Sequence, residues 1–264
     1  QLTTLVENFP GFPEGIQGPE LMTAMRKQAE HFGTEIVERE FVSGNFDSKP
    51  FTVRTSDSEY EGRSVIIATG ADTKWLGVPG EREKIGRGVS SCAPCDGPFF
   101  KNKNVIVVGG GDSAMEEALV LTNFAQSITL VHRKEAFRAS EIMQKRVKEN
   151  PKIKILFNTE IKEILGDQRV EKVRLFNNKT NQESEMPIEG VFVAIGHIPN
   201  SKVFEGIDRD ERGFVKVYAG YRTNIEGVFV AGDVHDALYK QAVTAAGFGC
   251  AAALEAQWWL DSMD

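Results

Sequence analysis

Two cysteines separated by two residues carry the clearest chemical signal in the sequence. Cys92 and Cys95 form a CxxC motif, and Asp96 and Gly97 follow directly. Such a pair can cycle between a disulfide and two thiols, and its thiols can be acidified enough to react at neutral pH. The carboxyl group of Asp96 could supply or remove the proton that this chemistry needs. We therefore expect Cys92, Cys95 and Asp96 to be the catalytic residues of a dithiol redox centre.

A zinc site is the main alternative for this cysteine pair. Zinc would need two more ligands, but the remaining candidates are Cys250 and four histidines, with no second CxxC motif and no matching His pair. We therefore predict no metal site. Cys250 lies among small residues and is expected to be a buried packing residue. Tandem Trp258 and Trp259 are expected to pack as well, with a dimer surface as the alternative for an exposed one, and His235 receives no role.

A glycine-rich turn indicates a nucleotide site. A GxGxxA motif stands directly between a strand-like run at 104–108 and a helical run at 112–125. In this setting the glycines permit a tight turn and close approach of a pyrophosphate, the alanine allows close helix packing, and the helix N-terminus stabilises phosphate charge. An ordinary turn is the alternative for the glycines alone, but the flanking strand and helix favour a dinucleotide site. The candidate contacts are Gly109, Gly111, Asp112, Ser113 and Ala114.

A basic cluster follows the next predicted strand, 127–132, where the adenosine ribose of a bound dinucleotide would lie. The cluster consists of His132, Arg133, Lys134 and Arg138. An NAD-selective site usually offers a carboxylate here, whereas basic residues suit a 2′-phosphate, which an Arg fork can bind through two hydrogen bonds. The sequence therefore favours NADPH over NADH, with a solvated basic turn as the alternative. Ile195 and Gly196, at the end of a later strand, are added as candidate cofactor contacts.

Size and composition limit the class of protein. With 264 residues, two compact units are expected rather than one. The net charge of −7 offers no broad basic surface for nucleic acid, and no apolar run approaches the ~20 residues of a membrane span. Three cysteines, two of them in the CxxC motif, suit a reducing compartment, so the cytoplasm is the expected location. No signal peptide is evident, but the sequence opens on Gln1 without a methionine, so this says little about targeting.

The hydrophobic pattern before the CxxC motif predicts a helix followed by short strands. Apolar residues at helical spacing indicate a helix over 18–33, which ends on a glycine. A stretch rich in glycine, proline and charge is interpreted as a linker over 74–88. The strand-like runs expected between helix and linker are 34–40, 51–55 and 64–68.

The region after the CxxC motif has the strand and helix order of a parallel, doubly wound sheet. Strands are expected at 104–108, 127–132, 152–157, 172–177 and 190–195, and helices at 112–125 and 139–149. A polar stretch then leads to predicted strands at 214–218 and 227–231 and a helix at 241–260, which would complete the first unit. The prediction is an α/β protein with two Rossmann-like nucleotide-binding domains, in which 83–210 is inserted between 1–82 and 211–264.

In their order, these motifs resemble the low-molecular-weight thioredoxin reductases over essentially the whole chain. The matching elements are Gln1-Leu2-Thr3-Thr4, Glu7-Asn8-Phe9-Pro10-Gly11, Ala68-Thr69-Gly70, the CxxC motif followed by Asp-Gly, GGGDSA, HRKxxxR and Ala231-Gly232-Asp233. In that family the NADPH domain is inserted into a split FAD domain, which would make 83–210 the NADPH domain. The FAD contacts that the resemblance implies are Gln1, Asn8, Ala68, Thr69, Gly70, Gly232, Asp233, Lys240, Gln241 and Ala242.

Several features depart from the family pattern. Lys240 and Lys134 stand where family members commonly have Arg, which keeps the charge but loses the planar fork. Pro94 stands where they commonly have Thr, which could shift the redox potential of the cysteine pair. The family also opens with a strand, a GxGxxG turn and a helix that hold the ADP part of FAD. This opening is not found in the sequence, so the chain is expected to hold FAD weakly.

The resemblance implies an NADPH-dependent thioredoxin-disulfide reductase. Electrons would pass from NADPH through FAD to the Cys92–Cys95 disulfide and on to thioredoxin or a thioredoxin-like dithiol protein. Cys95 would face the flavin, Cys92 would attack the partner's disulfide, and Asp96 would handle the proton. A homodimer and a rotating NADPH domain are also implied, with hinges expected in 77–88 and 198–213. The alternatives are a sister enzyme that serves a peroxidase or another dithiol carrier, and an NADPH-binding redox sensor without flavin.

Overall fold

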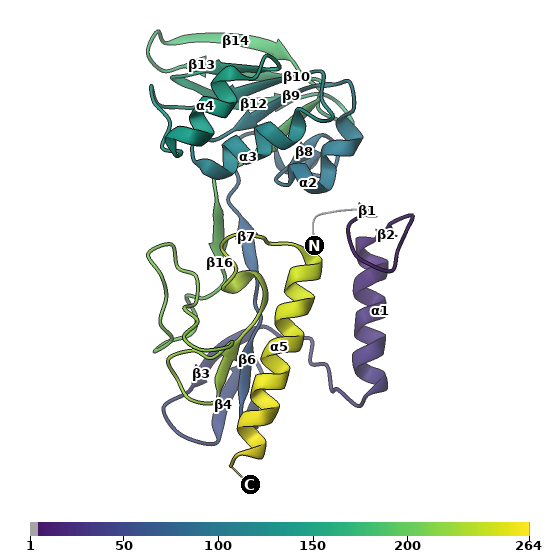
Figure 1. Cartoon of the computed structure of the whole chain (residues 1–264), viewed down its shortest axis with the longest axis vertical. Helices are drawn as coiled ribbons and strands as arrows, with labels where there is room; N and C mark the ends of the chain where they lie inside the picture. The colour runs from purple at the N-terminus through teal and green to yellow at the C-terminus, as the bar shows by residue number, and fades with distance from the viewer. Residues whose placement is uncertain (1–4, 264) are drawn as a thin grey trace. The chain divides into compact units, whose positions relative to one another are not determined.

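The computed structural model describes residues 5–263, and the chain forms two compact units (Figure 1). The first unit consists mainly of Thr73–Gly196, together with an N-terminal stretch that includes Phe12–Met22. The second consists mainly of Thr23–Asp72 and the chain from His197 onward. The chain therefore leaves the second unit at 72/73 and returns to it at 196/197. Both points lie earlier in the sequence than the expected domain boundaries, 82/83 and 210/211. They also lie outside the expected hinges, 77–88 and 198–213.

A five-stranded parallel sheet forms the centre of the first unit. Its strands stand in the order β11-β10-β9-β15-β8, and every neighbouring pair is parallel. The strands are β8 (Val89–Ser90), β9 (Asn104–Val108), β10 (Ser127–Val131), β11 (Ile153–Leu156) and β15 (Gly190–Val193). Because parallel strands run in one direction, the turns that follow them emerge at one edge of the sheet. The CxxC, glycine-rich and basic motifs follow β8, β9 and β10, so they share that edge.

Both faces of this sheet are covered, and consecutive residues of β9 point to the two faces in turn. Val105 and Val107 pack with the buried side of α3 (Asp112–Leu121) on one face. Ile106 and Val108 pack on the other face against a separate antiparallel sheet. A parallel strand covered on both faces needs apolar residues throughout, which explains why the run at 104–108 was recognised from the sequence. The expected α/β class and the parallel sheet are confirmed.

The antiparallel sheet of the first unit was only partly expected. It consists of β12 (Thr159–Leu165), β13 (Lys172–Asn177) and β14 (Gln182–Pro187), of which only β13 was predicted. The register of β12 shifts between Ile161 and Glu163, which interrupts the two-residue period that marks a strand. β14 is exposed along most of its length and is largely polar, so no hydrophobic alternation marks it.

Most helices agree with the sequence-based expectations. The predicted helix at 18–33 is α1 (Gly18–His31), and that at 139–149 is α4 (Glu141–Glu149). The short elements that the sequence did not reveal are β1 (Leu5–Val6), β2 (Ile16–Gln17), α2 (Ala93–Asp96) and the 3₁₀ turns Arg82–Lys84, Gly97–Phe100 and Gly232–Val234. Within residues 5–263, no helix combines the length and the apolar character needed to cross a bilayer.

The second unit is built around a parallel pair of strands and the last helix. β6 (Val65–Ile67) pairs with β17 (Val228–Val230), and α5 (Ala242–Asp261) packs on β17. Val228 and Val230 face one apolar cluster, whereas Phe229 faces α5. The expected strands and helix here are confirmed within a few residues. Two further strands, β7 (Ala71–Thr73) and β16 (His197–Pro199), lie where the chain passes between the units.

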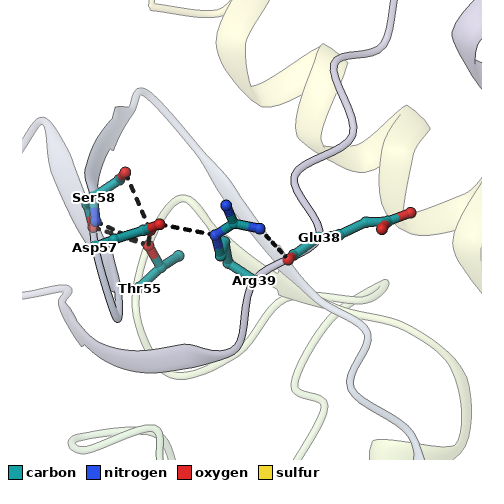
Figure 2. Close-up of polar contacts among 5 residues, drawn as sticks. All are labelled: Glu38, Arg39, Thr55, Asp57 and Ser58. Atoms are coloured by element: carbon teal, nitrogen blue, oxygen red, sulfur yellow. Dashed lines mark hydrogen bonds and ion pairs between the residues drawn. The ribbon is translucent and has the colours of Figure 1, made fainter.

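The segment 34–40, which precedes β3, is joined to the turn between β4 and β5 by a side-chain contact rather than by strand pairing. β3 (Phe41–Asn45), β4 (Phe51–Thr55) and β5 (Glu59–Gly62) form an antiparallel sheet, but residues 34–40 form no strand. The Arg39 guanidinium donates to the Asp57 carboxylate at 2.8 Å, at the turn between β4 and β5 (Figure 2). The strand expected at 34–40 is wrong because its apolar residues are exposed and no neighbouring strand pairs with them.

The segment 74–88, expected to be a linker, is packed into the first unit. Trp75 and Val78 contact the apolar cluster beneath the antiparallel sheet. Glu81 is fully buried, and its carboxylate accepts hydrogen bonds from the backbone N–H groups of Leu76 and Gly77 at 2.9 and 2.7 Å. The glycines and charges that suggested a flexible linker therefore belong to a fixed turn. The expectation failed because the partner of the buried charge is the backbone, which the sequence does not display.

In the second unit, the segment 214–218 and two residues of α5, Cys250 and Trp258, differ from the structure expected from the sequence. The strand predicted at 214–218 is wrong: Val215 makes only an isolated bridge to Arg209, although it is buried. Cys250 is exposed on α5 rather than buried, since it lies on the side of the helix that does not face β17. Trp259 is buried against Phe229 as expected, whereas Trp258 is 58% exposed.

Removing the buried carboxylate of Glu81 should destabilise the first unit. Glu81→Leu leaves two backbone N–H groups unpaired, and we expect a loss of about 3 kcal/mol in the free energy of unfolding. Urea unfolding followed by tryptophan fluorescence measures this loss, because Trp75 lies in the same turn. Glu83→Leu is the matched control, since Glu83 is exposed and its replacement should cost less than about 0.5 kcal/mol. Equal effects of the two substitutions would show that the Glu81 hydrogen bonds do not hold the segment.

Candidate active site

The CxxC motif lies on a single helical turn that directly follows β8. Cys92 is the N-cap residue of α2, and it forms a disulfide with Cys95, with 5.3 Å between their Cα atoms. Pro94 lies in the first turn of this helix. A backbone N–H at that position would have no partner within the helix, so proline loses no hydrogen bond there. Both cysteines are partly exposed, so the disulfide can be reached by a reaction partner.

A serine links the first cysteine to the neighbouring carboxyl group. The Ser90 hydroxyl donates to Asp96 at 2.6 Å and accepts from the backbone N–H of Cys92 at 3.1 Å. Burial raises the pKa of Asp96 above its ordinary value, and the hydrogen bond from Ser90 opposes this rise. A carboxyl group whose pKa is raised keeps its proton at higher pH, as a proton donor to a thiolate must. Sequence spacing identified Asp96 but gave no signal for Ser90.

A second carboxylate connects the turn that carries the disulfide to α3. The backbone N–H of Ala93 donates to Glu117 at 2.5 Å, and Glu117 lies on α3, which begins directly after the glycine-rich turn. The N-terminal end of α2 is therefore fixed by a side chain from the helix that starts at the glycine-rich turn. The sequence gave no indication of this contact, because 24 residues separate the two partners.

A cavity of ≈ 610 Å³ in the first unit contains most of the predicted NADPH contacts. The predicted residues that line it are Gly109, Gly111, Ser113, His132, Arg133, Arg138, Ile195 and Gly196. Lys134, Asp112 and Ala114 do not line the cavity. Residues 74–76 and Val78 line it together with Thr159–Lys162, and the sequence gave no signal for either group. The three turns after β9, β10 and β15 thus converge on one cavity at the shared edge of the sheet.

Close packing explains the glycines of the fingerprint. A side chain at Gly109 would place its Cβ 2.4 Å from the Ala194 carbonyl oxygen, and one at Gly110 would lie 2.2 Å from the His132 ring. Gly111 differs, because nothing lies within 4 Å of its missing Cβ. Its backbone is therefore open to the cavity, which suits close approach of a phosphate group. Ala114 is fully buried and supports the close approach at Gly109 rather than contacting a ligand.

Two residues of the predicted nucleotide site act within the protein. The Asp112 carboxylate accepts hydrogen bonds from the backbone N–H and hydroxyl of Ser140, which lower its pKa and fasten the start of α4. His132 is buried beside Phe137, and burial lowers its pKa, an effect increased by the charges of Arg138 and Arg133. A neutral imidazole carries no charge to offer a phosphate. The positive charges at the cavity are those of Arg133, Arg138, Lys74 and Lys162, of which Lys162 is paired with Glu160.

A second cavity, of ≈ 740 Å³, lies beside the redox turn in the same unit. Ser90 and Asp96 line it together with Phe99, which is 45% exposed, and the basic side chains of Arg87 and Lys103 also contribute. An exposed aromatic residue next to a reactive disulfide is typical of a protein-binding surface. The sequence analysis did not single out these residues.

In the second unit, the segment after β17 has an unfilled acceptor. Gly232 has a positive φ of 71°, and Asp233 follows it with a buried carboxylate oxygen, Oδ1, that has no hydrogen-bond partner among residues 5–263. Burial raises the pKa of Asp233, and the charge of Asp236 adds to this effect. A buried acceptor without a donor is a position that a ligand hydroxyl group could satisfy.

The other predicted FAD contacts of the second unit are held by local hydrogen bonds. The Thr69 hydroxyl donates to the Asn200 carbonyl at 2.7 Å, and the Asn200 backbone N–H donates to Gly70 at 2.9 Å, which fixes the turn after Ala68. Lys240 donates to the Ala237 carbonyl at 2.8 Å. Gln241 is the N-cap of α5 and Ala242 is its first residue. Asn8 is among the described residues, whereas Gln1 lies outside them.

Within the described residues, His235 belongs to an aromatic cluster rather than to a metal site. The His235 ring packs between Tyr221 and Phe248, with ring centroids 5.7 and 4.8 Å away, so it is part of an aromatic cluster. In the part of the chain from residue 5 to 263, no group of three or more His, Cys, Asp or Glu side chains is arranged to hold a metal ion.

A disulfide on a parallel α/β unit, together with a cavity beside a GxGxxA turn, is the arrangement expected of a pyridine-nucleotide-dependent disulfide oxidoreductase. The comparison with protein families agrees with this class. Residues 1–249 match the model of the pyridine nucleotide-disulphide oxidoreductases, and the chain belongs to this family.

Sequence relatives place the chain within the thioredoxin reductases of this family. It is 50% identical to a thioredoxin reductase of Mycolicibacterium smegmatis, with 99% of this chain and 85% of the relative covered. It is 49% identical to a bifunctional thioredoxin reductase/thioredoxin of Mycobacterium leprae, with 98% of this chain and 57% of the relative covered. Among solved structures, the thioredoxin reductase of Giardia duodenalis superposes with a TM-score of 0.92 at 40% identity, covering 98% of this chain and 86% of that one.

Substitution of Ser90 should raise the pKa of Asp96 further. Ser90→Ala removes the hydrogen bond that stabilises the carboxylate, so the protonated form should persist to higher pH, as an NMR titration of the carboxyl carbon would record. Because the pKa of Asp96 is higher in the folded state than in the unfolded chain, its contribution to the free energy of unfolding decreases as the pH rises from the unfolded pKa through the folded pKa. Ser91→Ala is the control, because the Ser91 hydroxyl bonds to Thr73 instead. An unchanged titration in Ser90→Ala would show that Ser90 does not set the proton affinity.

Proposed function

We propose that the protein is an NADPH-dependent flavoprotein that reduces the disulfide of thioredoxin or of a thioredoxin-like dithiol protein. The observation that carries this proposal is the CxxC disulfide on the same unit as a dinucleotide cavity lined by two arginines. The overall reaction converts NADPH, a proton and the disulfide of the partner into NADP⁺ and two thiols on the partner. It is an oxidoreductase reaction on sulfur groups.

The two arginines support NADPH rather than NADH as the electron donor. Arg133 and Arg138 both line the cavity, and within residues 5–263 neither guanidinium has an ion-pair partner. Unpaired guanidinium groups at a cavity can bind a 2′-phosphate through charge-assisted hydrogen bonds. The pyrophosphate would lie against the open backbone at Gly111 and the N-terminus of α3. We therefore assign 73–196 as the NADPH-binding domain.

The second unit fits a flavin nucleotide. The unpartnered Oδ1 of Asp233 and the positive φ of Gly232 provide a buried acceptor and a backbone that can approach a ligand closely. These residues would hold FAD together with the segments 68–70 and 240–242 of the same unit. When bound, FAD would supply the flavin chemistry that couples a hydride donor to a disulfide.

The dithiol turn supports exchange with a partner disulfide. We assign Cys92 as the thiol that attacks the partner and Cys95 as the thiol that then resolves the mixed disulfide, an assignment that follows the family resemblance. The attack forms one sulfur–sulfur bond and breaks the partner's, and the leaving thiolate needs a proton. Asp96 lies next to Cys95 with a raised pKa, which suits it to supply that proton.

A thioredoxin-like protein is the partner that fits best. Phe99 is exposed beside the redox turn, and the basic side chains of Arg87 and Lys103 flank the same cavity. A relative that is 49% identical is named a bifunctional thioredoxin reductase/thioredoxin, which supports thioredoxin as the acceptor. We further propose a cytoplasmic homodimer, since the three cysteines suit a reducing compartment and the exposed Trp258 offers an apolar contact.

Removal of both arginines should weaken NADPH binding selectively. Charge-assisted hydrogen bonds are each worth about 1.5–3 kcal/mol, so Arg133→Ala combined with Arg138→Ala should raise the KM for NADPH about 100-fold or more. The KM for NADH should change little. Lys134→Ala is the comparison variant and should have a smaller effect, because Lys134 does not line the cavity. Equal effects on the KM values of both nucleotides would contradict the assignment.

Single cysteine variants should separate the two halves of the reaction. Cys92→Ser and Cys95→Ser should each abolish reduction of thioredoxin, while NADPH still bleaches the flavin absorbance, because the disulfide acts after the hydride transfer. In addition, Cys95→Ser should trap thioredoxin as a mixed disulfide through Cys92, which nonreducing electrophoresis detects. A mixed disulfide formed by Cys92→Ser instead would reverse the assigned roles. Loss of bleaching in both variants would place the cysteines elsewhere in the reaction.

A further inference from the structure

We propose that Asn178 is a positioning residue for the 2′-phosphate of NADPH: its side-chain amide holds the backbone of Arg133 and keeps a neighbouring carboxylate away from the Arg133 guanidinium. The inference deepens the proposed function, on which it rests. Asn178 follows directly after β13, on the antiparallel sheet, and it does not line the cavity.

Three consecutive carbonyl groups of the basic turn accept hydrogen bonds from this sheet. The His132 carbonyl accepts from the Thr159 backbone N–H at 3.0 Å, and the Lys134 carbonyl accepts from that of Asn158 at 3.1 Å. The carbonyl between them, that of Arg133, accepts from the Asn178 side-chain amide at 2.8 Å. Backbone donors would remain in any variant, so the Arg133 contact is the one that a single side chain controls.

The other end of the basic loop is fastened to the glycine-rich turn. The backbone N–H groups of Arg138 and Ala139 donate to the Gly110 carbonyl at 2.7 and 3.2 Å. The loop is therefore anchored at both ends, and its two arginines reach the cavity from a fixed backbone. A bidentate contact between guanidinium and phosphate depends on such fixed geometry.

Asn178 also controls a negative charge at the same cavity. Its amide donates to Glu160 Oε1 at 3.1 Å, while Lys162 contacts Glu160 Oε2 at 2.9 Å. Glu160 lines the cavity together with Arg133, yet no ion pair joins the two in the described part of the chain. Both oxygens of the carboxylate are thus engaged elsewhere. Without Asn178, one oxygen of Glu160 would be released and could compete with a phosphate for Arg133.

Both consequences concern only a ligand that carries a 2′-phosphate. NADH and 5′-AMP lack this group, so their binding does not depend on the position of Arg133. A residue with a merely structural role would change the affinity for both kinds of ligand. The ratio between the two affinities therefore reports on positioning.

Calorimetric titration of the complete enzyme with 2′,5′-ADP and 5′-AMP tests the proposal. Asn178→Leu should lower the affinity for 2′,5′-ADP about tenfold, the effect of one lost hydrogen bond of roughly 1.4 kcal/mol, and leave that for 5′-AMP within about twofold. Asn123→Leu is the matched control, because the Asn123 amide donates to the Val120 carbonyl at 3.1 Å outside the cavity. In an Arg133→Ala background, Asn178→Leu should have no further effect on 2′,5′-ADP binding.

Each outcome gives a decision. If the unsubstituted enzyme binds 2′,5′-ADP no better than 5′-AMP, both the NADPH assignment and the role of Asn178 are overturned. If it prefers 2′,5′-ADP and Asn178→Leu keeps the full preference, the role of Asn178 is overturned and the NADPH assignment stands. Parallel loss of affinity for both ligands, or additive losses in the double variant, shows a structural role and also overturns the proposal.

Discussion

The parallel direction of β8, β15, β9 and β10 is the constraint on which the site depends. Because these strands run the same way, the four turns that follow them emerge at one edge of the sheet. The dithiol follows β8, the glycine-rich turn follows β9, the basic turn follows β10, and Gly196 closes the turn after β15. Segments up to about a hundred residues apart in sequence thus contribute to one surface of one unit.

Long-range hydrogen bonds then fix the turns that the sheet brings together. Glu117 fixes the redox turn from α3, Gly110 holds one end of the basic loop, and the antiparallel sheet holds the other. In each case a turn at this edge is held by residues outside the turn itself. Such second contacts are what keep catalytic and binding groups in productive geometry. The antiparallel sheet therefore holds the basic turn as well as covering the core.

The sequence predicted the elements whose pattern follows from their own burial. β9 is apolar from Val105 to Val108 because both of its faces are covered, and the close approach of Ala194 and His132 leaves no room for a side chain at Gly109 and Gly110. It failed where a hydrogen bond between a side chain and the backbone decides the outcome, because composition does not reveal such a bond. The segment 74–88 has the composition of a linker, but Glu81 binds its backbone and fixes it.

The same distinction applies to the site. Cys92, Cys95 and Asp96 were found because their chemistry lies in their spacing, and Arg133 and Arg138 were found because the end of a strand places them. Ser90, Glu117 and Asn178 were not found, since a serine, a helix carboxylate and a turn asparagine are common on any surface. Lys134 was included because it follows the same strand as Arg133, yet it does not line the cavity.

In the proposed function, electrons from NADPH leave the protein through the Cys92–Cys95 dithiol. The most direct measurement is the ratio of new thiols on thioredoxin to NADPH oxidised by the FAD-loaded enzyme under anaerobic conditions. Two thiols are expected for each NADPH, and none when Cys92 is replaced by Ser. NADPH oxidation without new thiols, or thiol formation that survives the loss of Cys92, would contradict it.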